Sequence, residues 1–159
     1  MQPVRCIVAI IAASLFVVGT TQNSAAQRLN LPGSDLTLTL GPPLVPGGDP
    51  QPVTDSSRRL MWLQLPRSGV YKVMVSTGIV SQSFQLFVTP TAVRNGTPGP
   101  TVELVEGMTP VDFVTDIARR PRPNGRATLL YRAEAPAESG STNSQGSDVH
   151  TVIYIFTAQ

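Results

Sequence analysis

The chain of 159 residues has one cysteine, Cys6, one histidine, His150, and one lysine, Lys72. A single cysteine cannot form an internal disulfide, and it cannot supply the several thiolates of a structural zinc site. Charged residues make up only 14% of the chain and give a formal net charge of +2. So small a charge provides no broad positive field for nucleic acid, which we therefore do not expect as a partner.

The first residues have the three-part pattern of a secretory signal peptide. Arg5 precedes an apolar run at residues 7–18, and small residues at 24–26 follow a polar stretch. The run is short for a membrane-spanning helix, which argues against the alternative of an uncleaved anchor helix. We predict a signal peptide over residues 1–26, cleaved after Ala26. The mature protein is then expected to be disulfide-free, exported to the periplasm, cell surface or extracellular space, and without an integral membrane span.

The rest of the chain is rich in turn residues, and the whole sequence has 15 prolines and 13 glycines. Short segments of alternating or β-branched residues lie between the turns, a pattern typical of antiparallel strands. We predict a flexible stretch at residues 27–34 and a single domain at 35–159. The expected fold class is all-β, an antiparallel immunoglobulin-like or Greek-key β-sandwich of about seven or eight short strands.

Individual strands and turns follow from the same pattern. Residues 66–69 are expected to join the second and third strands as a hairpin, and Asn124-Gly125 to supply the two positive φ values of another. Segment 110–118 suits either a strand or a brief helical turn. Residues 41–52 and 91–100 are expected to be loops. The expected strands are residues 35–40, 58–65, 70–77, 83–89, 101–105, 126–135 and 148–158.

The closing strand, residues 148–158, is apolar on both faces. One face carries Val152, Tyr154 and Phe156, which suit the core of a sandwich. The other face carries Val149, Ile153 and Ile155, although a two-layer sandwich has only one inside. We expect intramolecular cover from residues 41–52 or 110–118, and the alternative is an interface with another chain.

Residues able to do catalytic chemistry are sparse. His150 and Asp148 are two residues apart on one strand, and no serine lies in a Gly-x-Ser-x-Gly turn, so a catalytic triad is not indicated. A set of acids could lend oxygens to a calcium ion, but the spacing of a calcium-binding loop is missing. We therefore expect no enzyme, no metal and no cofactor. The acids considered for calcium are Glu103, Glu106, Asp112 and Asp116.

Four arginines, Arg119, Arg120, Arg122 and Arg126, lie on one proline-containing turn. Guanidinium groups pair bidentately with carboxylates or phosphates, so this turn could bind a polyanion such as an acidic polysaccharide. The alternative is a solvated hairpin tip whose charge prevents edge-to-edge aggregation.

The end of the chain resembles a known group of proteins. Residues 146–159 are similar to the closing strand of small exported bacterial immunoglobulin-like β-sandwich proteins, and of the spore-coat-U and fimbrial-subunit group. In that group a glycine precedes an alternating apolar strand, and Gly146 occupies this place. Residues 69–73 extend the likeness. The chain departs from the group in lacking its cysteines and in having Ala158 where an aromatic residue is usual.

These observations favour a non-enzymatic structural or interaction protein of the cell envelope or surface. Its partner would be a second copy of the chain or another envelope protein. Residues 35–40 could then serve as a strand given to a neighbour. The alternative function is a binding module for a glycan or another anionic envelope component.

Overall fold

The computed structural model describes residues 5–13, 28–46, 48–65, 68–78, 84–119, 124–135 and 147–159. The fold is all-β, as the sequence predicts, and no helix occurs among these residues. None of the described segments is a helix able to cross a membrane. The strands are β1 (Arg5–Ala13), β2 (Arg28–Asn30), β3 (Leu36–Thr39), β4 (Val53–Leu63), β5 (Val70–Gly78), β6 (Gln85–Arg94), β7 (Thr97–Pro98), β8 (Val102–Glu103), β9 (Val111–Ala118), β10 (Gly125–Glu134) and β11 (Ser147–Ala158).

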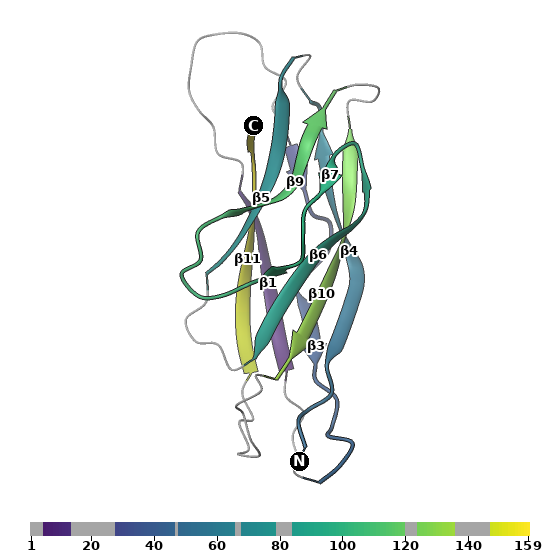
Figure 1. The fold of residues 1–159 in the computed structure, drawn as a ribbon, viewed down its shortest axis with the longest axis vertical. Coiled ribbons are helices and arrows are strands. Elements are labelled where there is room, and N and C mark those ends of the chain that lie inside the picture. The colour runs from purple at the N-terminus through teal and green to yellow at the C-terminus, as the bar shows by residue number, and fades with distance from the viewer. Residues whose placement is uncertain are drawn as a thin grey trace.

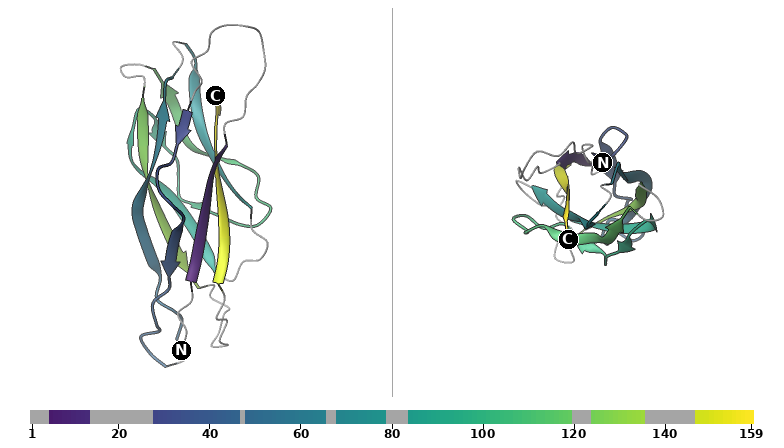
Figure 2. Two further views of the ribbon diagram at one scale, coloured as in Figure 1. Left: turned by 180° about the vertical axis from the view of Figure 1, so that it is seen from behind. Right: turned by 90° about the horizontal axis from the view of Figure 1, so that it is seen from above.

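The strands form two sheets that face each other across a single core (Figure 1). The first, sheet A, has the order β3-β1-β11-β5-β9-β7, and the second, sheet B, has the order β2-β4-β10-β6-β8. Every pairing is antiparallel except that of β1 with β11, which is parallel. Seen from above, the sheets curve around the space that the core fills (Figure 2).

The core is built from alternate residues of the long strands. Trp62, Val73 and Leu129, which the alternating pattern assigns to the inside, are all completely buried. The inward face of β11 is as predicted, because Val152 and Tyr154 are completely buried and Phe156 is 5% exposed. Burial of this many large side chains is the main favourable term that holds the fold together.

Strand positions agree with the pattern better than strand ends do. Segment 110–118 is a strand, β9, and contains no helical turn. Strand β4 begins five residues earlier than the predicted residue 58, and β6 continues to Arg94 through residues expected to be a loop. A bulge permits this extension, because Ala92 has a φ of 48° where the register of β6 and β10 shifts.

Both predicted hairpins are wrong. Strands β4 and β5 belong to different sheets, as do β9 and β10. After β4, Gln64 adopts a φ of 58° and Leu65 is buried, and the next strand belongs to the other sheet. Asn124 and Gly125 are not among the described residues with positive φ. Instead, the Asn124 side chain accepts a hydrogen bond from the Gln64 backbone N–H at 3.0 Å, which ties the two crossings together.

Candidate functional site

Strand β11 lies inside sheet A, between β1 and β5, and presents its second apolar face outward. On this face Val149 is 53% exposed, whereas Ile153 and Ile155 are half-buried. Ile153 lies opposite Ser76 and Ile155 opposite Met74 on β5. Much of the shielding that half-buries these residues therefore comes from neighbouring strands of the same sheet.

The two segments expected to cover this face behave differently. Residues 111–118 form β9, which is hydrogen-bonded to β5 within sheet A. This segment therefore lies beside the face and cannot cover it, which corrects the prediction. The loop at 41–52 closes on itself through two backbone hydrogen bonds between Gly41 and Gln51, at 3.1 and 2.9 Å. It extends beyond the ends of β3 and β4 (Figure 1).

The N-terminal segment that the sequence predicts to be a signal peptide, called the leader below, contributes a strand to sheet A. Residues 5–13, which the sequence assigns to a signal peptide, form β1 and pair along their whole length with residues 147–155 of β11. The two strands run side by side and parallel (Figure 2). Cleavage after Ala26 remains a prediction, and that residue lies outside the described part of the chain.

Strand β3 depends on β1 for its place in sheet A. Among the described strands, β3 pairs only with β1, through residues 36–39 opposite residues 5–8. Its inward residues Leu36 and Leu38 are buried against the core, and Thr37 and Thr39 are exposed. Without β1, a gap the width of one strand would separate β3 from β11. The backbone N–H and C=O groups that line this gap on both strands would then have no strand partner.

A tyrosine pair joins the two sheets in the middle of the core. Tyr131 on β10 and Tyr154 on β11 are both completely buried, and their hydroxyl oxygens are 2.8 Å apart. Burial raises the pKa of both hydroxyls well above the ordinary value, because the surroundings cannot solvate a phenolate. Both groups therefore stay protonated, and the pair acts as a polar clasp between the sheets.

His150 is an interior residue. It is completely buried, and its ring lies 5.0 Å from that of Phe84. A catalytic histidine needs access to a substrate, which this position does not offer. A small pocket of about 30 Å³ lies elsewhere, between residues 31–35 and Arg58, and holds little more than one water molecule.

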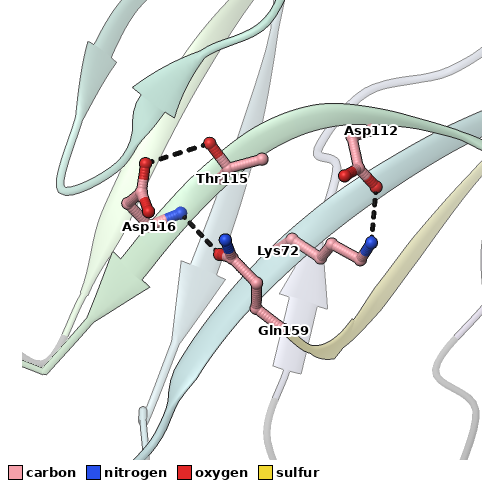
Figure 3. Close-up of polar contacts among 5 residues, drawn as sticks. All are labelled: Lys72, Asp112, Thr115, Asp116 and Gln159. Carbon is pink, nitrogen blue, oxygen red and sulfur yellow. Dashed lines mark hydrogen bonds and ion pairs between the residues drawn. The ribbon is translucent and has the colours of Figure 1, made fainter.

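Three of the four acids considered for calcium are engaged in other contacts, and Glu106 is exposed. Asp112 forms a salt bridge of 2.7 Å with Lys72, and Asp116 accepts a hydrogen bond of 3.1 Å from the Thr115 hydroxyl (Figure 3). Asp116 has a φ of 55° and lies in a bulge of β9, where the register with β5 shifts. Its backbone N–H donates a hydrogen bond of 2.9 Å to the Gln159 side chain, which holds the bulge in place. Glu103 lies in sheet B and accepts a hydrogen bond from Gln85. Within the described residues no group of three or more metal-ligating side chains comes together.

Of the four arginines of the predicted anion site, Arg119 and Arg126 lie in the described part of the chain. Arg119 is exposed just beyond β9, whereas Arg126 is half-buried within β10. Arg120 and Arg122 lie outside the described residues. Arg126 lies directly opposite Arg94 of β6. The sequence pattern could not reveal this neighbour, because it depends on the register of two strands that are distant in the chain.

Comparison with protein-family models, curated proteins and solved structures found no match for this chain.

Proposed function

We propose that the protein is a non-enzymatic structural or interaction protein, exported to the cell envelope or surface, which associates by strand pairing at sheet A. The observation that carries this proposal is the place of β1, a strand formed by the leader, between β3 and β11. Removal of the leader would leave hydrogen-bonding groups on both flanking strands free to pair with an added strand.

The occupant favoured by the geometry is an extended apolar strand of a second copy of the chain. Residues 36–39 are a candidate donor, because β3 has no described strand partner other than β1. Their alternation of buried leucines and exposed threonines is the pattern that an added strand needs on a half-buried sheet. Self-association would then replace the pairing that the leader supplies.

As part of the same proposal we place the fold among immunoglobulin-like Greek-key sandwiches. Its support is the pair of facing sheets, between which the chain crosses after every strand from β1 to β10. The non-enzymatic assignment is supported by the burial of His150 and of the tyrosine pair, which places the most chemically versatile side chains beyond the reach of a substrate.

The experiment compares residues 27–159 with the full chain by size-exclusion chromatography with light scattering. We expect the full chain to be monomeric and the shorter chain to form dimers or larger species. A peptide of residues 5–13, added in excess, should return the shorter chain to a monomer. The control peptide carries Val8→Asp and Ile10→Asp and should have no effect, because these positions lie opposite the buried residues His150 and Val152, beside which a charge is unfavourable. A shorter chain that is folded, monomeric and indifferent to the peptide would contradict the proposal.

A further inference from the structure

The outer face of sheet B carries three arginines close together, which we call the arginine surface: Arg59, Arg94 and Arg126. Arg94 and Arg126 are direct cross-strand neighbours on β6 and β10, a position that puts Cβ atoms about 5 Å apart. Arg59 on β4 lies opposite Thr128, two residues along β10 from Arg126, so it is a diagonal neighbour at about 7–8 Å. Their inward neighbours Leu60 and Ala127 are buried, which places the arginines on the outer face.

No carboxylate neutralises this surface among the described residues. The two salt bridges among the described residues both lie away from the arginine surface. They are Lys72–Asp112, in sheet A, and Arg132–Glu134, at the far end of β10. The acids of sheet B lie level with residues 131–134 of β10, five to eight residues along the strand from Arg126. They are Asp55, Glu103 and Glu134. The outer face of sheet B is therefore positive at one end only. Like charges directly opposite each other destabilise a sheet, so the Arg94–Arg126 pairing carries a cost that an anion would remove.

Protection of a sheet edge does not explain Arg126. Charged side chains prevent aggregation when they lie on edge strands, and the edges of sheet B are β2 and β8. Arg126 lies on β10, which pairs with β4 on one side and with β6 on the other. This removes, for Arg126, the alternative role that the sequence suggested.

We infer that the arginine surface binds an acidic polysaccharide through carboxylate or sulfate groups. This goes beyond the proposed function, which concerns the other sheet. A polymer with regularly spaced anions can contact arginines on successive strands at once, and guanidinium groups pair bidentately with such anions. Single-stranded nucleic acid is less well matched, because the large hydrophobic side chains exposed in the described residues are all aliphatic, whereas base stacking needs aromatic ones.

The test uses the full chain and the double variant Arg94→Gln/Arg126→Gln. Its matched control is Arg119→Gln/Arg132→Gln, which removes the same charge from exposed positions outside the surface. The probes are heparin, which carries sulfates and carboxylates, polygalacturonate, which carries carboxylates only, and a single-stranded oligonucleotide. Affinities are measured by titration calorimetry at several salt concentrations. Binding of polygalacturonate identifies carboxylate as sufficient, and binding of heparin alone identifies sulfate.

We expect the first double variant to bind the polysaccharide ~10-fold more weakly and to lose ~2 from the slope of log affinity against log salt, because two ion contacts are removed. The control should stay within ~2-fold of the parent. Thermal melting should show that the first variant is at least as stable as the parent, because a repulsive pair is gone. Equal weakening in both variants, no binding of either polysaccharide by the parent, or equally tight binding of the oligonucleotide would each overturn the inference.

Discussion

The tyrosine pair shows how a polar contact can be stable inside an apolar core. Tyr131 and Tyr154 each place a large ring in the interior, and each hydroxyl gives the other its hydrogen-bonding partner at 2.8 Å. The Tyr154 ring also packs against Phe113, with ring centroids 5.6 Å apart. A buried hydroxyl is tolerated only when it is hydrogen-bonded. At this position one residue from each sheet satisfies the requirement of the other.

Replacing one member of the pair should therefore cost more than replacing both. We expect Tyr154→Phe to lower the free energy of unfolding by about 1–3 kcal/mol, because the Tyr131 hydroxyl is left buried without its partner. The double variant Tyr131→Phe/Tyr154→Phe should be closer to the parent, since no unsatisfied hydroxyl remains. Urea denaturation measures both. A double variant whose loss equals the sum of the two single losses would argue against the pairing.

The raised pKa of the two tyrosines predicts a loss of stability in alkaline solution. The unfolded tyrosines ionise near the ordinary value of 10.0, while the folded ones stay protonated, so the unfolded state binds fewer protons above that pH. The free energy of unfolding is therefore unaffected by these tyrosines below about pH 10. Above that pH it falls by about 1.4 kcal/mol per pH unit for each tyrosine. Urea denaturation between pH 9 and 11.5 should show a flatter profile for the double phenylalanine variant.

Gly125 is required by close packing and not by its backbone angles. A Cβ at this position would meet the Trp62 indole nitrogen and would lie 2.5 Å from the Arg94 carbonyl oxygen. The Trp62 indole N–H donates a hydrogen bond of 3.1 Å to the Asn95 carbonyl, so a shift of the ring would also disturb the turn after β6.

We expect Gly125→Ala to lower the free energy of unfolding by about 1–3 kcal/mol through overpacking. Gly78→Ala is the control, because a Cβ added at residue 78 would meet no atom within 4 Å. Chemical denaturation monitored by Trp62 fluorescence compares the two. An alanine variant at 125 as stable as the one at 78 would show that the ring moves aside at no cost.

Among the elements, strand β11 has an inward face that is buried in the core and an outward face that is only partly buried. Ile153 and Ile155 are half-buried by the side chains of β5, whereas Val149 remains 53% exposed. The outward face therefore changes character along the strand. Substitutions on it should differ in effect according to position.

We expect Ile153→Asp to destabilise the monomer by about 1–3 kcal/mol, because a carboxylate would replace an alkyl group in contact with its sheet neighbours. Val149→Asp should change stability by less than about 0.5 kcal/mol, as is usual for an exposed site. Both are measured by urea denaturation of the full chain. If Ile153→Asp left stability unchanged but abolished self-association of residues 27–159, the outward face would be an interface between chains.

At the scale of the whole molecule, the sheets are joined by their shared core, since a single cysteine allows no internal disulfide. Sheet A is continuous only because β1 bridges β3 and β11. The position of β3 should therefore depend on whether the leader is present.

Hydrogen exchange read by mass spectrometry tests this dependence. At a concentration low enough to keep residues 27–159 monomeric, amides of residues 36–39 should exchange at least ~10-fold faster than in the full chain, because their hydrogen-bonded partner strand is missing. Amides of β10, in the middle of sheet B, serve as the internal reference and should be unchanged. Equal protection of residues 36–39 in both chains would mean that β3 is held by core packing alone.

The alternation of apolar residues predicted much of this fold, because burial on one face of a strand imposes a period of two on the sequence. It located the strands that contain Leu36, Trp62 and Val73, and it assigned Val152, Tyr154 and Phe156 to the core. It could not locate strand ends set by bulges, such as the extension of β6 beyond Ala92. A bulge forms where one of two paired strands has an extra residue, so it depends on both strands and cannot be predicted from the sequence of either one alone.

Composition and local periodicity are enough to establish the all-β class, the absence of an internal disulfide and the inward face of the closing strand. Which strands are neighbours is a property of the tertiary structure alone. It separated β4 from β5 and β9 from β10 into different sheets, placed β1 beside β11, and set Arg94 opposite Arg126. Strand register is a property of pairs that are distant in the chain, so both candidate binding surfaces become visible only when the sheets are assembled.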